Sequence, residues 1–341
     1  MSETMQALLY TTSFDLEVRV VPSPQPGNEE VVVRVEAAGI CGSDLHGVAS
    51  RSPRRAPPLI MGHELCGEVV AAGGPAGQPL IGARVAVNPQ VPCRDCSVCR
   101  SGRENACPRR EFIGGTRPGG FAELVAVPVR CLHPVSLDLP ADVAVFSEPL
   151  ATCVHALRLV PDSLTDVAVV LGAGTIGVLA AQVLRVAGTR VIVVSEVDEA
   201  RRRSAANIAD AVVAPDGVYD FVNEMTGGSG VSLSIDAVGS NDTRRDSIRV
   251  LQPGGVALWL GMHEQSAEIP AFDLVVREQR VQGSFAYTNP EFGRAIGLLE
   301  SGLVVPGVSQ KSFPLEESGR AFGRLLDGSS QGFLKAIVCP A

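Results

Sequence analysis

Residues 166–186 read DVAVVLGAGTIGVLAAQVLRV. The first six residues, an aspartate followed by five apolar residues, predict a buried β-strand, and the apolar residues after the glycines predict a helix. Between them stands the pattern G-x-G-x-x-G, which is weak evidence alone and much stronger between a strand and a helix. Gly172 permits a tight turn, Gly174 lets the backbone approach a pyrophosphate, and Gly177 lets the helix pack closely on the strand. This stretch therefore predicts a dinucleotide-binding unit.

The start of the helix completes the predicted phosphate site. Thr175 and Ile176 form its first turn, whose free N–H groups face the phosphates of a bound dinucleotide. Strands and helices continue to alternate after this unit, which predicts a parallel sheet with helices on both faces. The sequence thus predicts an α/β fold with a doubly wound Rossmann domain.

Glu196 ends the second strand of this region, about 24 residues after the first glycine, where such folds place an acid for the adenosine ribose. A carboxylate there accepts hydrogen bonds from both ribose hydroxyls and repels a 2′-phosphate, so NAD is the favoured cofactor. Arg201, Arg202 and Arg203 follow closely and could hold the extra phosphate. NADP therefore stays open as the less favoured alternative.

The composition limits the classes of protein to which the chain can belong. Its 341 residues allow about two domains. The net charge of −8 argues against a nucleic-acid partner, which normally requires a basic face. The acidic start and the lack of a long apolar run predict neither a signal peptide nor a membrane span. We therefore expect a cytoplasmic protein whose partner is a small molecule.

A β-rich region comes first, and its strongest strand, residues 31–37, runs straight towards Cys41. We expect Cys41 to lie where that strand ends and a loop begins, a common place for chemistry. His63 and Glu64 follow about twenty residues later, and a thiolate, an imidazole and a carboxylate can together hold one zinc ion. The sequence therefore indicates a catalytic zinc site.

Ser43 and His46 add a hydroxyl and a second imidazole near this group, and the two could move a proton. Two of the metal ligands have ordinary alternatives when each is taken alone. Cys41 would then be a small buried hydrophobe, and His63 a hydrogen-bonded core histidine. The whole set at this spacing favours the metal site.

Four of the nine cysteines form a tight cluster with the spacing C-x2-C-x2-C-x7-C. Four thiolates satisfy all four tetrahedral positions of a zinc ion and leave none for a substrate, so we expect a structural zinc. An iron–sulfur cluster is the alternative, since it also takes four thiolates. Disulfides are less expected in a reducing compartment. The four residues are Cys93, Cys96, Cys99 and Cys107.

The stretches Gly39–His46 and Gly62–Glu64 resemble the motifs G-x-C-G-[ST]-D-x-H and G-H-E of the zinc-dependent medium-chain dehydrogenases. The resemblance is to the branch that holds polyol (sorbitol-type) and threonine dehydrogenases, and it extends to the cysteine cluster. It implies a β-rich GroES-like catalytic domain at residues 1–150, which includes a structural zinc lobe at about 91–110. A Rossmann domain would follow at residues 151–286, and the chain would return to the catalytic domain at residues 287–341.

The same resemblance assigns further site residues. Glu148, in a Glu-Pro-Leu setting, would reach the catalytic zinc directly or through its water, although it could instead only stabilise the start of a helix. Gly239, Gly261 and Met262 would lie along the nicotinamide, although they could be simple turn residues. A basic residue at the position of Arg201 also occurs in NAD enzymes of this family, which keeps NAD as the preferred cofactor.

The resemblance also implies a reaction. The protein would be a zinc-dependent oxidoreductase that transfers hydride from a secondary alcohol of polyol, sugar or cyclitol type to NAD and gives a ketone. Zinc would lower the pKa of the substrate hydroxyl, whose proton would leave through Ser43 and His46. Asp44 would orient a ligand or a loop amide. Relatives form tetramers and dimers, so we expect a homotetramer, with a dimer as the alternative.

Other functions stay open at this point. An L-threonine 3-dehydrogenase is the first alternative, although the Glu-Pro form at Glu148 is more typical of the polyol branch. Ala286 stands where sorbitol dehydrogenases tend to carry an arginine, which argues against sorbitol itself. A zinc-free reductase or a non-catalytic nucleotide-binding relative is less favoured, because no metal ligand is lost from the sequence.

Overall fold

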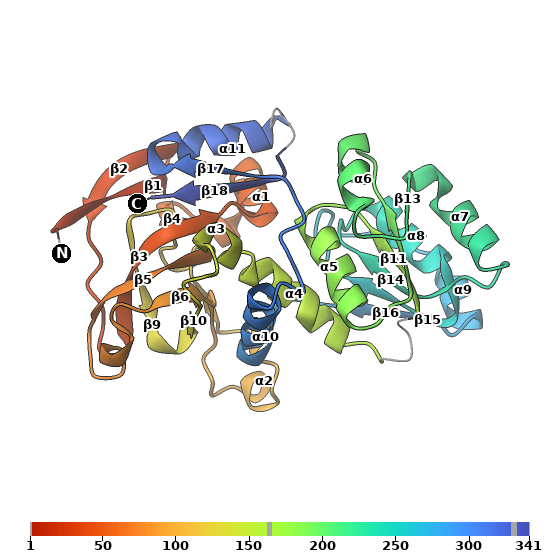
Figure 1. The fold of residues 1–341 in the computed structure, drawn as a ribbon, viewed down its shortest axis with the longest axis horizontal. Helices are drawn as coiled ribbons and strands as arrows, with labels where there is room; N and C mark the ends of the chain where they lie inside the picture. The colour runs from red at the N-terminus through yellow and green to blue at the C-terminus, as the bar shows by residue number, and fades with distance from the viewer. Residues whose placement is uncertain (1, 162–165, 329–332, 341) are drawn as a thin grey trace. The chain divides into compact units, whose positions relative to one another are not determined.

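The computed structural model describes residues 2–161, 166–328 and 333–340. The chain divides into two compact units, each with its own sheet structure (Figure 1). Unit 1 comprises Met1–Glu148, Thr288–Gly302 and Ser309–Ala341, and unit 2 comprises Pro149–Tyr287 and Leu303–Val308.

Unit 1 is built on mainly antiparallel strands. The largest sheet has the order β10-β6-β5-β3-β18-β17, with β9 also paired to β3, and smaller sheets have the orders β2-β1-β4 and β7-β8. Valine side chains of β3 enter the main apolar core together with Phe121 and Phe322. The strands are β1 (Thr4–Tyr10), β2 (Leu16–Pro22), β3 (Glu30–Gly39), β4 (Leu59–Ile60), β5 (Glu64–Ala72), β6 (Arg84–Val87), β7 (Gln90–Val91), β8 (Glu111–Phe112), β9 (Leu124–Pro128), β10 (Leu132–Pro134), β17 (Gln310–Pro314) and β18 (Lys335–Cys339).

The α-helices of unit 1 range from one turn in α2 and α3 to 12 residues in α10. They are α1 (Gly42–Ala49), α2 (Ser97–Arg100), α3 (Ala141–Ala144), α10 (Asn289–Glu300) and α11 (Ser318–Leu326), while α4 (Ser147–Arg158) begins in unit 1 and continues in unit 2. The expected loop after Cys41 is wrong, because α1 begins at the next residue and Cys41 is its N-cap. The Asp44 carboxylate accepts the backbone N–H of Cys41, which helps the helix to start there.

Unit 2 contains a six-stranded sheet in which every neighbouring pair is parallel, with the order β13-β12-β11-β14-β15-β16. This is the strand order of a Rossmann domain, and the predicted fold class is confirmed. Helices α5, α6 and α8 pack on the sheet. The elements are β11 (Val167–Leu171), α5 (Thr175–Val186), β12 (Val191–Ser195), α6 (Glu199–Ala205), β13 (Ala211–Val213), α7 (Val218–Met225), β14 (Val231–Asp236), α8 (Asn241–Arg249), β15 (Leu251–Trp259), α9 (Ala271–Val276) and β16 (Arg280–Gly283).

The C-terminal part of the chain differs from the expected continuous return to the first domain. Leu303–Val308 belongs to unit 2. The backbone of Val305 exchanges two hydrogen bonds with the amide of Gln182 on α5, at 2.8 and 3.0 Å. These bonds satisfy backbone groups that have no sheet partner, which is the local reason for the excursion.

Within the described residues, none of the helices has both the length and the apolar character that a membrane span needs.

Candidate metal and coenzyme sites

The strand pairing of unit 1 brings Cys41, His63 and Glu64 together. β3 and β5 are antiparallel neighbours, and Gly39 at the end of β3 lies opposite Glu64 at the start of β5. Cys41 follows β3 by two residues and His63 directly precedes β5, so the three side chains meet at one end of this strand pair. One ligand atom from each lies within 4.8 Å of the other two.

Asp44 contacts two members of this group, the His63 ring and the backbone of Cys41. Its side chain is fully buried on the first turn of α1, with Oδ1 3.2 Å from Nδ1 of His63 and Oδ2 accepting the N–H of Cys41 at 3.2 Å. Burial by itself would raise the pKa of Asp44, but the charges of His63 and Arg55 hold it below its ordinary value. An ionised Asp44 on Nδ1 leaves Nε2 of His63 as the nitrogen that can bind a metal.

Lys335 is an unforeseen member of the site. It comes from β18 and forms an ion pair with Oε2 of Glu64, and both side chains are almost completely buried. Gly39 leaves room for the pair, because a Cβ there would stand 2.2 Å from Oε2 of Glu64 and 2.9 Å from Cε of Lys335. Burial alone would lower the pKa of Lys335, but Glu64 and Cys41 raise it above its ordinary value, so the ammonium stays charged.

The donor set of this group fits zinc. A thiol, an imidazole and a carboxylate are the usual protein ligands of zinc sites that keep a position open. Oε1 of Glu64 is buried and accepts no hydrogen bond from the described residues, although Oε2 faces Lys335. A buried carboxylate oxygen without a donor is costly, and a bound cation would satisfy it.

The other predicted residues of this centre lie nearby in different settings. Ser43 is half-buried on α1 and His46 is exposed on the same helix. Among the described residues, no hydrogen bond joins their side chains directly. Glu148 is half-buried on the first turn of α4, outside the group whose ligand atoms lie within 4.8 Å, but its charge contributes to the raised pKa of Lys335.

The four clustered cysteines have the geometry of a tetrahedral thiolate site. Their Sγ atoms all lie within 4.8 Å of one another, with separations of 3.9 Å for Cys93–Cys99, 3.9 Å for Cys96–Cys107 and 3.5 Å for Cys93–Cys107. Four sulfurs at the usual distance from zinc are about 3.8 Å apart, whereas a disulfide requires about 2.05 Å. The backbone N–H of Cys99 lowers the pKa of Cys96 to about 6, which favours a thiolate.

Two cysteines outside both groups have the opposite character. Burial raises the pKa of Cys66 to about 12 and that of Cys131 to about 11. Both therefore stay protonated at neutral pH and behave as small core residues.

The glycine-rich turn of unit 2 has the shape that a dinucleotide needs. Gly172 has φ +97°, and a Cβ on Gly177 would stand 1.8 Å from the carbonyl oxygen of Gly172, so neither position accepts a side chain. By contrast, a Cβ on Gly174 would meet no atom within 4 Å. Gly174 is the N-cap of α5, and it has no side chain that could accept a hydrogen bond from the first turn. The N–H groups at Thr175 and Ile176 therefore face an open cradle.

Glu196 closes the end of β12 beside this turn. Its side chain is buried, with Oε2 accepting the N–H of Ala173 at 2.7 Å and Oε1 accepting the N–H of Asp198 at 2.9 Å. Each oxygen keeps a second lone pair for a ribose hydroxyl. Arg202 donates to the backbone carbonyls of Glu196 and Val197, whereas Arg201 is exposed and forms no ion pair within the part of the chain that the structure describes.

The turns after β14 and β15 lie against each other. A Cβ on Gly239 would stand 2.3 Å from the carbonyl of Gly261, and a Cβ on Gly261 would stand 2.1 Å from the carbonyl carbon of Val238. Met262 follows with 63% of its side chain exposed. These glycines therefore have a packing role whether or not they also contact a coenzyme.

Comparisons with known proteins agree with both units. A family model for the GroES-like domain of alcohol dehydrogenases matches residues 27–137, and one for zinc-binding dehydrogenases matches residues 175–301. An L-threonine 3-dehydrogenase from Saccharopolyspora erythraea is 32% identical over 93% of this chain and 95% of its own. The chain belongs to the zinc-dependent medium-chain dehydrogenase family. An L-galactonate-5-dehydrogenase from Escherichia coli is 30% identical over 88% of this chain and 89% of its own.

A solved structure resembles this medium-chain dehydrogenase over nearly its whole length. It is a protein from Sinorhizobium meliloti described as a putative zinc-binding dehydrogenase and bound to NADP, with 33% identity, a TM-score of 0.91, and coverage of 99% of this chain and 100% of the other. The comparison supports a dinucleotide cofactor of the NAD(P) type without deciding between the two.

Lys335 and Arg55 lie at the candidate zinc centre of this medium-chain dehydrogenase, although the sequence did not predict them there. Lys335 gave a weak signal, as the single charge at the start of the otherwise apolar strand β18. Arg55 lies in a basic, proline-rich stretch with Arg51 and Arg54, whose composition is typical of a surface loop, but its side chain is buried against Asp44. Only the fold brings these two cations to the site.

Proposed function

We propose that this medium-chain dehydrogenase is an NAD-dependent zinc enzyme that oxidises a secondary alcohol of polyol, sugar or cyclitol type to a ketone. The observation that carries the proposal is the convergence of Cys41, His63 and Glu64 on one point, with a buried carboxylate oxygen that accepts no hydrogen bond from the described residues. The four cysteines at 93–107 would hold a second, structural zinc ion, and the use of clustered cysteines for metal binding supports a cytoplasmic setting.

In this proposal the metal supplies Lewis acidity, which lowers the pKa of the substrate hydroxyl. Cys41, Nε2 of His63 and Glu64 would hold it, and Glu148 would act as a further ligand, directly or through a water molecule. Ser43 would take up the proton of the substrate hydroxyl, because it is half-buried and lies two residues from Cys41. His46, exposed on the same helix, would pass that proton to solvent.

Unit 2 would bind the coenzyme through groups of the chain itself. Gly174 and the N–H groups of Thr175 and Ile176 would cradle the pyrophosphate, and Glu196 would accept from the ribose hydroxyls. An ionised Glu196 disfavours a 2′-phosphate, which supports NAD over NADP, and Arg201 would lie at the side of the adenosine. Gly239, Gly261 and Met262 would border the nicotinamide.

An L-threonine 3-dehydrogenase activity is the second candidate, because a curated protein of that name covers almost the whole chain at 32% identity. The relative named L-galactonate-5-dehydrogenase supports the polyhydroxylated class at a similar identity. The two functions are separated by their substrates, since threonine carries an ammonium group beside its hydroxyl and a sugar acid carries further hydroxyls.

A substrate panel tests the proposal. Purified enzyme is assayed with polyols, sugars, sugar acids, cyclitols, threonine and simple secondary alcohols, with NAD and with NADP, and zinc is quantified on the same sample. We expect turnover of a polyhydroxylated compound with NAD and about two zinc ions per chain. In Cys41→Ala turnover should disappear, the zinc content should fall by one, and NADH binding should persist. Turnover of threonine alone would favour the second candidate, and full activity of Cys41→Ala would exclude the zinc mechanism.

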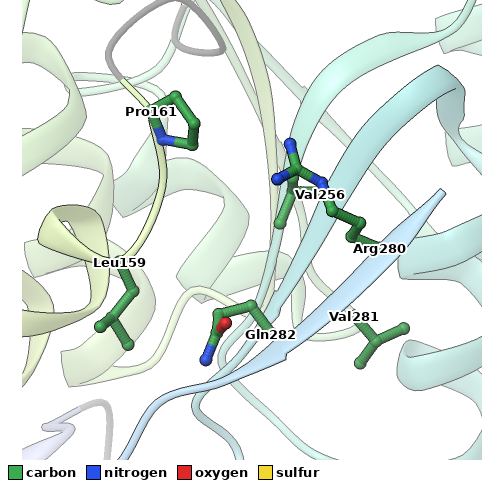
Figure 2. Close-up of a pocket in the computed structure, with 6 residues that line it drawn as sticks. All are labelled: Leu159, Pro161, Val256, Arg280, Val281 and Gln282. Carbon is green, nitrogen blue, oxygen red and sulfur yellow. The ribbon is translucent and has the colours of Figure 1, made fainter.

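We also propose that the protein is a homo-oligomer, with a tetramer preferred and a dimer as the alternative. β16 is the edge strand of the unit 2 sheet, and all four of its residues are exposed. A pocket of about 220 Å³ lies along this edge. It is lined by Arg280, Val281 and Gln282 of β16 together with Leu159, Pro161 and Val256 (Figure 2). An exposed strand edge with apolar residues beside it is suited to pairing with a second copy.

A further inference from the structure

Arg55 is a buried cation beside the candidate zinc centre, and two glycines of unit 1 leave the space that its side chain occupies. It ends the short 3-10 helix Pro53–Arg55 and is only 8% exposed. A Cβ on Gly47 of α1 would stand 2.6 Å from Cγ of Arg55, and a Cβ on Gly115 would stand 2.8 Å from Nη1. A side chain at either glycine would therefore displace the arginine.

The guanidinium joins two groups that have different tasks in the proposed function. Nη2 donates to Oδ1 of Asp44 at 3.2 Å and to Oγ of Ser43 at 3.3 Å. Oδ1 of Asp44 is also the atom that lies 3.2 Å from Nδ1 of His63. One nitrogen of Arg55 thus reaches both the orienting carboxylate of a metal ligand and the hydroxyl that would take up the substrate proton.

Phe112 adds a second connection between Arg55 and His63. The guanidinium carbon lies 5.3 Å from the centre of the Phe112 ring, and the same ring lies 5.1 Å from the His63 ring, tilted by 47°. The ring therefore fills the space between the two side chains and limits the movement of each.

The burial of Arg55 argues against a purely stabilising role. Nε is buried and finds no hydrogen-bond partner among the described residues, so part of the charge is desolvated without compensation. Buried ion pairs are often no more stable than apolar residues of similar size, because desolvation offsets the attraction. The arrangement instead fixes the orientation of the Ser43 and Asp44 side chains. Ser43 keeps one lone pair and its own hydrogen for proton transfer, and the Asp44 carboxylate stays aligned on His63.

We propose that Arg55 is a positioning residue that couples the metal-holding pair Asp44 and His63 to the proton-accepting hydroxyl of Ser43. The proposal rests on the proposed function and adds to it a role for a side chain outside the ligand and relay residues. Loss of Arg55 should weaken metal binding and slow the chemical step together. Loss of a neighbouring arginine should do neither.

The test compares Arg55→Met with Arg54→Met. Arg54 is the matched control, because it precedes Arg55 in the same short helix, is exposed and forms no ion pair within the described part of the chain. Metal-free proteins are prepared, zinc affinity is measured by competition with a chromogenic chelator, and kcat and KM are measured at saturating zinc. For Arg55→Met we expect about tenfold or greater loss of zinc affinity and a similar fall in kcat, with KM little changed. Arg54→Met should remain near the wild type in both.

Arg55→Lys keeps the inference testable if Arg55→Met does not fold, as judged by circular dichroism. Lysine keeps the charge opposite Asp44 but lacks the planar guanidinium, so zinc affinity should largely recover while kcat stays reduced. Wild-type zinc affinity and kcat in a folded Arg55→Met, or wild-type kcat in Arg55→Lys, would overturn the inference. A wild-type protein that holds no catalytic zinc and oxidises no alcohol would instead refute the proposed function itself.

Discussion

Glu64 faces two possible cationic partners, and the competition between them is the main residue-scale feature of the site. Lys335 occupies the side of Oε2, while Oε1 lies buried without a hydrogen-bond donor in the described structure. A metal bound by Glu64 and the ammonium of Lys335 would share one carboxylate. Lys335 therefore compensates Glu64 when no ion is bound and weakens its hold on an ion when one is bound.

Lys335→Met should make the protein more dependent on zinc. Without metal, Glu64 becomes an unpaired buried carboxylate, which costs about 3 to 5 kcal/mol of unfolding free energy. Bound zinc would restore a partner, so zinc should raise the Tm of the variant more than that of the wild type. Thermal unfolding in the presence of EDTA and of zinc measures both shifts, with Lys311→Met as control because Lys311 is exposed on β17. Equal zinc-induced shifts in variant and wild type would show that zinc does not bind through Glu64.

The site residues that the sequence could predict differ from those that it could not predict in their residue types and in their spacing along the chain. Cys41, His63 and Glu64 could be grouped from the sequence because their spacing is short and each residue type is a common zinc ligand. Their roles as zinc ligands stay a prediction, as do those of Ser43 and His46. Arg55 and Lys335 could not be assigned, because arginine and lysine are ordinary surface residues and only side-chain direction buries these two.

At the scale of elements, the six-residue glycine motif at the start of α5 contains two glycines with different roles. Gly177 is required by packing, whereas Gly174 borders open space. The motif predicts different roles for the two glycines, and the surroundings of each Cβ show that the fold itself needs Gly177 but not Gly174.

Gly174→Ala and Gly177→Ala should therefore have opposite effects. Gly174 has φ −73°, which alanine adopts without strain, so Gly174→Ala should keep its Tm but bind NADH several-fold more weakly, because the methyl group enters the pyrophosphate space. Gly177→Ala should lower the Tm, since its Cβ would stand 1.8 Å from a carbonyl oxygen. Fluorescence titration with NADH and thermal unfolding measure the two effects. Wild-type NADH affinity in Gly174→Ala would contradict the proposed cradle.

Asp236 at the end of β14 gives a pH-dependent prediction for the same sheet. Burial raises its pKa above the ordinary 3.8, although the N–H groups of Val238 and Gly239 oppose the shift. A raised pKa means that the folded state holds the proton more tightly than the unfolded chain. The stability contributed by this group is therefore present at low pH, is lost as the pH rises through the raised pKa, and is absent at neutral pH.

Asp236→Asn removes the charge and keeps an oxygen that accepts from both N–H groups. The variant should be more stable than the wild type at pH 7, and the gain should shrink as the pH falls towards about 4. Trp259 lies opposite Asp236 in the β14–β15 register and is the single tryptophan, so its fluorescence during urea unfolding reports on unit 2. A variant less stable than the wild type at pH 7 would mean that the charged carboxylate binds the turn better than the amide.

At the scale of the whole molecule, the alternation of strands and helices was sufficient to predict the Rossmann sheet, because each βαβ unit is local in sequence. The course of the C-terminal region was not, because Leu303–Val308 is held in unit 2 by hydrogen bonds to Gln182 that no periodicity encodes. The oligomeric state belongs to the same category. It depends on a surface made by distant segments rather than on a motif.

The exposed edge of unit 2 carries the last prediction. In the described structure β16 pairs only with β15, and α9 in the same unit exposes 77% of Phe272 and 76% of Val275. If two copies pair along β16, Val281→Lys places like charges near the two-fold axis and removes an apolar contact, so the variant should be monomeric or reduced to smaller assemblies at micromolar concentration. Multi-angle light scattering gives the mass, and Val20→Lys, which changes an exposed valine of β2 in unit 1, should match the wild type. An unchanged mass for Val281→Lys would place the interface elsewhere, and a monomeric wild type would refute the homo-oligomer, because an edge strand that stays unpaired at high concentration needs no second copy.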